Sequence, residues 1–152
     1  MKKLITALAF SLIGLVSVSC NDDDNDRTIR PDQLPATTKT FLNTYFENES
    51  IARVEKNVPA EYDGTVYEVD MTNGYEADFS EDGTWLSVSQ ENDYGSIPTG
   101  FIDTKIIQYI SQNYPNVNVN SIDKEPSHIE VELTNNIDLI FNLNGDFVSI
   151  DY

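Results

Sequence analysis

One pattern of residues occurs twice in this chain of 152 residues. Residues 67–88 and residues 129–150 match position by position at an offset of 62 residues. In both segments apolar residues alternate with other residues, and this period of two predicts antiparallel strands with one buried face. Many matched positions are apolar or glycine in both copies: Tyr67 and Ile129, Val69 and Val131, Met71 and Leu133, Phe79 and Phe141, Gly83 and Gly145, Trp85 and Phe147, and Val88 and Ile150. The sequence therefore predicts two copies of one strand arrangement.

The first turn in each copy determines which strand residues lie opposite one another. In the first copy, residues 72–74 form a predicted three-residue loop, and its last residue, Gly74, suits a left-handed backbone. In the second copy Asn136 takes this position, and asparagine tolerates a left-handed backbone better than most residues. Both copies therefore predict the same register for the first hairpin, with Met71 opposite Tyr75 and Leu133 opposite Ile137.

The next turn contains Asp82-Gly83 in the first copy and Asn144-Gly145 in the second. Both dipeptides are strong signals for a two-residue hairpin loop. The pairs expected beside such loops are Phe79 with Leu86 and Ala77 with Val88 in the first copy, and Phe141 with Val148 and Leu139 with Ile150 in the second. One face of each sheet is then apolar throughout.

A helix is predicted before each set of strands. Leu34-Pro35 precedes apolar residues at helical spacing, and Ile97-Pro98 precedes a second such stripe, which Tyr114-Pro115 ends. Each unit is thus a helix followed by about four antiparallel strands, in residues 34–90 and 97–152. The predicted fold class is α+β, a tandem repeat with the helices packed on one face of the sheet.

Residues 1–19 have the features of a signal peptide. Lys2 and Lys3 form a positive start, and an apolar run follows that is too short for a membrane-spanning helix. The run leads to Cys20, the only cysteine, so the segment resembles a bacterial lipoprotein signal peptide whose cysteine is lipidated. Ser17 stands where such a signal usually has leucine. A signal peptide without lipidation is the alternative interpretation.

Residues 20–33 are predicted to be a flexible tether, because their acidic run, residues 21–26, cannot bury apolar surface. The run also resembles the acidic export tag of surface lipoproteins in the Bacteroidetes. Retention facing the periplasm and a simple spacer are the alternatives. The predicted location is therefore outside the inner membrane, anchored by lipid in the outer membrane and either periplasmic or on the cell surface.

Without residues 1–19 the chain has 7 basic against 26 acidic side chains. So large an acidic excess argues against nucleic acid as a partner and against electrostatic docking on anionic lipid. It favours a protein or peptide partner of basic character, or serves solubility alone. Contact with a membrane is expected only through the lipid on Cys20.

The predicted polar face of the sheet contains the candidate binding residues. In the derived register Glu68 lies opposite Asp78, Asp70 opposite Glu76, and Glu132 opposite Asp138. Like charges that face each other across strands destabilise a sheet. The same face is predicted to contain two large aromatic side chains, which often anchor protein partners. The candidate partner-binding residues are Trp85, Phe147, Glu68, Asp70, Glu76, Asp78, Glu130, Glu132 and Asp138. Alternatively, the two aromatic residues pack against the other unit or a loop, and the acids are merely solvated.

Signals for catalysis are nearly absent from the sequence. His128 is the only histidine and has no neighbouring cysteine, so we interpret it as a surface residue at a strand entrance rather than a metal ligand. Residues 78–83 faintly resemble a calcium loop, but Ser89 occupies the position of its closing glutamate. We therefore expect no enzyme activity, no cofactor and no dedicated metal site.

The order of these features resembles a known family. The Leu34-Pro35 helix, the aromatic-rich strand pairs and the Asp82–Trp85 hairpin, all in tandem, are similar to the PepSY-like, beta-lactamase-inhibitor-like lipoproteins of the Bacteroidetes. The resemblance covers about residues 34–152 and implies a tandem helix-plus-sheet architecture. By analogy it also implies binding, or inhibition, of a secreted protein. The alternatives are a structural or accessory envelope protein and a divalent-cation-binding module.

Overall fold

The computed structural model describes residues 27–151, which form a single nine-stranded antiparallel sheet and two α-helices. The strands are β1 (Arg27–Thr28), β2 (Ile51–Lys56), β3 (Tyr67–Met71), β4 (Tyr75–Phe79), β5 (Trp85–Gln90), β6 (Val119–Lys124), β7 (Ile129–Leu133), β8 (Ile137–Phe141) and β9 (Phe147–Asp151). The helices are α1 (Ala36–Tyr45) and α2 (Thr104–Asn113), with short 3₁₀ turns η1 (Pro31–Gln33) and η2 (Thr72–Gly74). The predicted signal peptide, Cys20 and most of the predicted tether lie outside the described residues.

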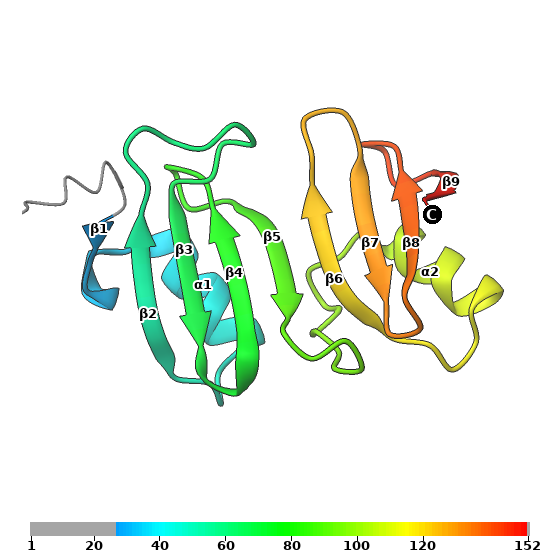
Figure 1. Ribbon diagram of the computed structural model, residues 1–152, viewed down its shortest axis with the longest axis horizontal. Helices are drawn as coiled ribbons and strands as arrows, with labels where there is room; N and C mark the ends of the chain where they lie inside the picture. Colours follow the sequence, from blue (N-terminus) through cyan, green and yellow to red (C-terminus); the bar gives the residue numbers. More distant parts are fainter. Residues whose placement is uncertain (1–26, 152) are drawn as a thin grey trace, which may run out of the picture.

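Each strand of the sheet pairs with the strand that follows it in the sequence. Helix α1 precedes β2 to β5, helix α2 precedes β6 to β9, and both helices lie on the same side of the sheet (Figure 1). Strands β5 and β6 join the two halves through two residue pairs, Ser87 with Asp123 and Val88 with Ile122. Neither helix within residues 27–151 has the length and apolar character that a membrane crossing requires.

The hydrophobic core lies between the helices and the sheet. Alternate residues of each strand point toward the helices, as the period of two requires, and these include Phe79 and Phe141, both fully buried. Ile106 of α2 is buried against the same core, to which Val54 and Ile122 of the two strands that follow the helices also belong. Both halves of the sheet therefore contribute to one core.

Helix α2 begins later than the sequence pattern indicated. The apolar stripe after Ile97-Pro98 includes Phe101, but the helix starts at Thr104. Asp103 is its N-cap, and the Asp103 carboxylate accepts a hydrogen bond from the backbone N–H of Lys105 at 2.8 Å. An aspartate cap satisfies a free backbone donor of the first turn and so fixes where the helix begins.

The first hairpin of each half has the predicted register. Val69 pairs with Ala77, Val131 pairs with Leu139, and Gly74 and Asn136 both have a positive φ, of 79° and 60°.

The second turn has a different form from the one predicted. In the first half the backbone N–H of Ser80 donates to the carbonyl of Thr84, and the N–H of Gly83 donates to the carbonyl of Ser80, both at 2.9 Å. These bonds enclose three loop residues and leave Gly83 in the left-handed region with a φ of 83°. The second half has equivalent bonds around Gly145. The predicted two-residue loop is therefore wrong in both halves.

The longer loop shifts the register by one residue, and a β-bulge directly after it shifts the register back. Phe79 pairs with Trp85, whereas Asp78 pairs with Ser87, so Leu86 is the extra residue in the bulge. Phe141 pairs with Phe147 in the same way, whereas Leu139 pairs with Ile150 as predicted. A shift of one residue reverses the face on which a side chain lies. The predicted position of Trp85 and Phe147 on the polar face is therefore wrong, because both pair with core residues.

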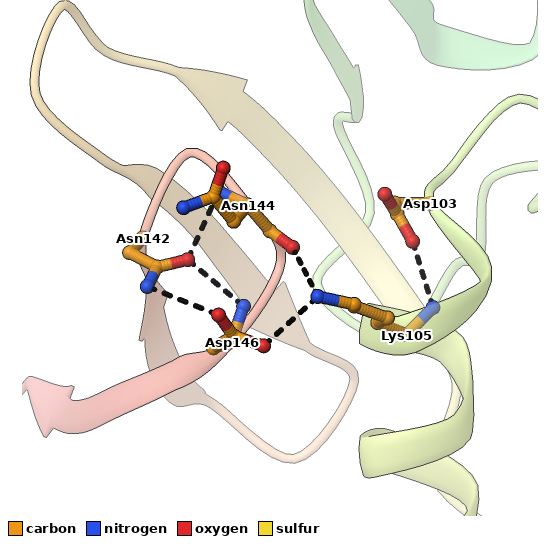
Figure 2. A network of polar contacts seen from close by, with 5 residues as sticks. All are labelled: Asp103, Lys105, Asn142, Asn144 and Asp146. Carbon is orange, nitrogen blue, oxygen red and sulfur yellow. Dashed lines mark hydrogen bonds and ion pairs between the residues drawn. The ribbon is translucent and has the colours of Figure 1, made fainter.

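The N-terminus of each helix contacts the hairpin turn of its own half. In the second half, the Lys105 ammonium donates to the carbonyl of Asn144 and to the carboxylate of Asp146, both at 3.0 Å (Figure 2). In the first half, a Cβ added to Gly83 would lie 2.7 Å from Thr38 Oγ1 and 2.8 Å from Pro35 Cβ. The helix and the turn thus approach so closely that Gly83 has no room for a side chain.

Candidate functional site

The face of the sheet opposite the helices carries two rows of mostly acidic side chains, which we call the acidic face. The first row crosses the sheet from β2 to β9 through residues that are directly opposite one another: Glu55, Glu68, Asp78, Ser87, Asp123, Glu130, Ile140 and Ser149. The second row contains Arg53, Asp70, Glu76 and Ser89 in the first half, and Ser121, Glu132, Asp138 and Asp151 in the second. The predicted pairs of like charge are confirmed: Glu68 with Asp78, Asp70 with Glu76, and Glu132 with Asp138.

Sequence reasoning missed the residues that make the first row continuous. Asp123 of β6 joins the two halves, because it lies opposite Ser87 of β5 on one side and Glu130 of β7 on the other. Glu55 extends the row onto β2, where it lies opposite Glu68. The signal was present, because Glu55 and Asp123 each follow a buried apolar residue in an alternating strand.

The acidic face has little cationic compensation within its two rows. Arg53 is the one cationic side chain in them, and its guanidinium contacts Asp70 at 2.7 Å and Glu55 at 2.8 Å. These ion pairs are partly exposed, and exposed pairs add little stability. Lys124 belongs to β6 but lies over the ring of Trp85, with its ammonium 3.2 Å from a ring centroid, on the helix side of the sheet. Most carboxylates of the face therefore have no cation beside them.

Asp78 is the most perturbed carboxyl group of the acidic face. Burial, and after it the nearby carboxylates of Glu76, Glu68, Asp123 and Asp63 in that order of importance, together raise its pKa to about 8. Its Oδ1 atom is buried and has no hydrogen-bond partner among residues 27–151. A buried carboxylate oxygen without a donor is costly, because the charged form loses its hydration.

Asn57 lies beside this cluster in the segment between β2 and β3, and it is only 3% exposed. Its side-chain amide donates to Glu68 Oε1 at 2.7 Å, whereas its Oδ1 atom is buried without a partner among the described residues. In the same segment Asp63 accepts hydrogen bonds from the backbone N–H and the hydroxyl of Thr65, both at 2.9 Å. Glu68 is thus fixed on one side by an amide and faces Asp78 on the other.

Other acids of the face are perturbed in the same direction. Burial raises the pKa of Asp123 and of Glu76, and for Glu76 the carboxylates of Asp70 and Glu68 add to the effect. In the second half, burial and then the nearby Asp138 raise the pKa of Glu130 and of Glu132. Together with Asp78, five carboxyl groups of the face therefore have a raised pKa.

The two aromatic candidates are not part of this face. The Trp85 ring lies 5.0 Å from the Phe101 ring and 6.3 Å from the Phe41 ring, measured between centroids. The Phe147 ring stacks on Tyr109 of α2 at 4.4 Å. Both side chains pack against the helix layer and adjoining segments, as the alternative interpretation of the sequence proposed. The structure brings the seven acidic candidates together on one face and places Trp85 and Phe147 on the other.

The described residues 27–151 contain no group of three or more His, Cys, Asp or Glu side chains arranged to hold a metal ion. His128 contacts the hydroxyl of its neighbour Ser127 at 3.0 Å.

A family model described as "Putative beta-lactamase-inhibitor-like, PepSY-like" matches residues 65–149 of the chain. The chain belongs to this family. The matched range begins just before β3 and ends within β9, so it contains all seven acidic candidates, from Glu68 to Asp138. No curated protein matches the sequence.

Three solved structures with the same fold come from Bacteroides species. One, from Bacteroides thetaiotaomicron, is described as a "putative calcium-regulated periplasmic protein"; it is 29% identical with a TM-score of 0.76, over 85% of this chain and 98% of that one. A second, described as a "putative periplasmic protein" from Bacteroides vulgatus, is 27% identical with a TM-score of 0.75, over 86% of this chain and 99% of that one. A third, also from Bacteroides vulgatus, is 24% identical with a TM-score of 0.74 and shows likeness of fold alone. This PepSY-like chain thus has the same fold as two proteins described as periplasmic over nearly their whole length.

Proposed function

We propose that this PepSY-like protein is an exported accessory protein of the bacterial envelope. It binds a basic segment of another secreted or periplasmic protein through the acidic face and catalyses no reaction. The observation that carries the proposal is the first row, in which acidic side chains on β2, β3, β4, β6 and β7 lie in line across the sheet, with Ser87 of β5 between those of β4 and β6.

The stability cost of this row supports a binding role. Like charges directly opposite one another destabilise a sheet by roughly 0.2–1 kcal/mol for each pair. The face contains several such pairs, among them Glu55 with Glu68, Glu68 with Asp78, and Asp123 with Glu130. A cationic partner converts this repulsion into attraction, because it supplies opposite charge where the sheet has concentrated one sign.

The spacing of the row indicates a partner geometry. Neighbouring strands lie about 4.8 Å apart, so the row presents side chains at about that interval across the sheet. This is close to the 5.4 Å pitch of an α-helix. Basic side chains on successive turns of a helix laid across the strands would therefore face successive carboxylates. By analogy with the family description, binding would inhibit the partner protein.

The proposed cellular placement follows from the sequence and the relatives. Residues 1–19 would be removed as a signal peptide, and a lipid on Cys20 would anchor the protein in the outer membrane through the tether, residues 20–33. Two solved relatives are described as periplasmic, which supports export. The folded part would consist of two tandem units, residues 34–90 and 97–152, each a helix followed by four strands that share the acidic face.

The test is a capture experiment with envelope and medium fractions of the producing cell. A double variant, Glu130→Gln with Glu132→Gln, removes two charges from the acidic face, and Glu47→Gln with Glu81→Gln removes two charges from exposed residues elsewhere. We expect the first variant to lose the captured partner and the second to retain it, with capture by the wild type weakening as salt rises. Equal capture by both variants, or capture that does not respond to salt, would count against the proposal.

A divalent cation is a second candidate ligand. The Bacteroides thetaiotaomicron protein is described as calcium-regulated, and Ca²⁺ binds carboxylate and amide oxygens of the kind present on the acidic face, including the buried oxygens of Asn57 and Asp78. A ligand that binds only the folded state raises the melting temperature. The test is a melting curve with and without CaCl₂ at constant ionic strength, and an unchanged melting temperature would rule this candidate out.

A further inference from the structure

We propose that, without a partner, the acidic face holds a proton between Glu68 and Asp78, and that a basic side chain binding there displaces this proton. Partner binding is then coupled to pH. The inference rests on the proposed function and adds to it the position where the partner's charge acts and the way in which pH regulates the interaction.

The first argument is the geometry of the two carboxyl groups. Glu68 and Asp78 are directly opposite each other on β3 and β4, a position in which side chains of an antiparallel pair touch. Asp78 Oδ1 is buried and has no donor among the described residues. A proton on Asp78 removes the buried charge and makes Asp78 a hydrogen-bond donor on the side of Glu68. A carboxylate directly opposite favours this neutral form, because like charges so close together oppose each other's ionisation.

The second argument is that Glu68 cannot turn away. The Asn57 amide holds Glu68 Oε1 at 2.7 Å, and Asn57 itself is only 3% exposed. The side of Glu68 that faces β4 is therefore left to Asp78. Because Asn57 is oriented by this bond, its own Oδ1 points away from Glu68 and stays without a partner within residues 27–151.

The third argument is the charge of everything around the pair. The charged groups that face it are Arg53 and Glu55 on β2, Asp63 in the segment before β3, Asp70 on β3, Glu76 on β4 and Asp123 on β6. Arg53 is engaged by Asp70 and Glu55, so it leaves the pair surrounded by carboxylates. Burial of Asp78, and after it the carboxylates of Glu76, Glu68, Asp123 and Asp63, raise its pKa to about 8.

The linkage follows from these charges. Below about pH 8 the Asp78 carboxyl is neutral, and a lysine or arginine brought beside it favours the ionised form. On binding, the O–H bond of the carboxyl breaks, the proton passes to the buffer, and the carboxylate pairs with the cation. Affinity therefore rises with pH up to about 8 and levels off above it, since the proton is then already lost. Lysine, with an ordinary pKa of about 10.4, stays charged throughout this range.

The experiment is isothermal titration of the protein with an oligolysine peptide blocked at both ends, at low salt. Measurements in two buffers of different ionisation enthalpy give the number of protons released. At pH 7 we expect a release approaching one proton for each peptide bound, and at pH 9 almost none. The affinity should increase roughly tenfold or more between pH 6 and pH 8, because one linked proton changes affinity by up to about tenfold for each pH unit.

Two variants separate the pair from the general charge of the face. Asp78→Asn should still bind the peptide but release no proton at pH 7, whereas Asp138→Asn, a matched change opposite Glu132, should release as many protons as the wild type. A carbon-13 NMR titration of the Asp78 carboxyl in the wild type needs no variant and should show titration near pH 8. In Glu68→Gln the same carboxyl should titrate lower.

The outcomes distinguish the two proposals. Binding without proton release at pH 7, equal loss of release in Asp78→Asn and Asp138→Asn, or titration of Asp78 below about pH 5 would overturn the inference and leave the proposed function standing. Absence of peptide binding at both pH 7 and pH 9 would overturn both.

Discussion

Replacing Asp78 by asparagine should stabilise the fold and flatten its pH dependence. An aspartate in an unfolded chain titrates near pH 3.9, whereas burial and neighbouring carboxylates raise the pKa of Asp78 to about 8 in the folded protein. Between these values the folded state binds a proton that the unfolded state does not. The free energy of unfolding therefore falls by up to about 1.4 kcal/mol for each pH unit as the pH rises from about 4 to about 8, and is constant in this respect above pH 8.

At pH 7 most of this loss has accumulated in the wild type. The asparagine of Asp78→Asn is neutral without taking up a proton on folding, and it has an N–H donor to offer on the side of Glu68. We therefore expect the free energy of unfolding to rise by about 2–4 kcal/mol at pH 7 and by much less at pH 4. Urea denaturation followed by circular dichroism at pH 4, 7 and 9 measures this difference. A shallower decline should remain in the variant, because the pKa of Glu76 and of Asp123 is also raised.

The matched control is Asp93→Asn, in the exposed segment between β5 and α2. Surface changes of this kind usually alter stability by less than about 0.5 kcal/mol. If Asp78→Asn were less stable than the wild type at pH 7, or if both proteins lost stability equally between pH 4 and pH 9, Asp78 would not be the buried neutral acid that the structure indicates.

Three further predictions concern the turns and the helix side. Gly83→Ala should lower the free energy of unfolding by roughly 3 kcal/mol or more, because it combines a positive φ with contacts of 2.7–3.0 Å to α1 and the residue before it. Gly145→Ala, whose added Cβ meets nothing closer than 3.4 Å, should lower it by about 1–2 kcal/mol. Equal losses of stability in thermal unfolding would contradict this. Trp85→Ala should destabilise the fold by about 2–4 kcal/mol and leave capture of a basic partner by the folded protein unchanged. Loss of capture without loss of stability would show that Trp85 belongs to the binding surface. Asp82→Asn should destabilise the protein at pH 7, because hydrogen bonds from Ser80 and Thr84 lower the pKa of Asp82. The stability difference between variant and wild type should disappear as the pH falls through that pKa. A difference that stays constant down to pH 2 would refute the prediction.

The pattern of alternating residues was sufficient to predict the register far from the turns. Asp70 and Glu76 face each other as derived, because the three-residue loop before β4 was correctly read from its final glycine. The second turn could not be read in this way. An Asp-Gly pair fits either a two-residue loop or the end of a three-residue loop, and the local sequence does not distinguish the two.

In the structure the longer loop accompanies a contact with a distant part of the chain. Gly83 packs against the start of α1, more than 40 residues earlier in the sequence. The bulge at Leu86 then restores the register, so the error is confined to the residues beside the turn. Those residues were the aromatic ones, and for that reason the predicted binding face included Trp85 and Phe147 in error.

The continuity of the acidic face could likewise not be predicted from the sequence repeat. Each copy of the pattern predicted its own patch, but Asp123 and Glu55 lie in strands outside the matched segments. The pairing of Ser87 with Asp123 depends on how β5 meets β6, across the whole length of α2 and its connectors. Long-range pairings of this kind leave no signal in local periodicity.

The consecutive order of the nine strands has a consequence for how the chain acquires its structure. Every strand finds its neighbour in the segment that has just preceded it, so an incoming hairpin always meets an edge that is already in place. A polypeptide that emerges gradually from a translocation channel, N-terminus first, can add such hairpins one after another. No strand then stays unpaired until a partner distant in the sequence has emerged. Only the steps from β1 to β2 and from β5 to β6 must wait, until the segments containing α1 and α2 have passed through.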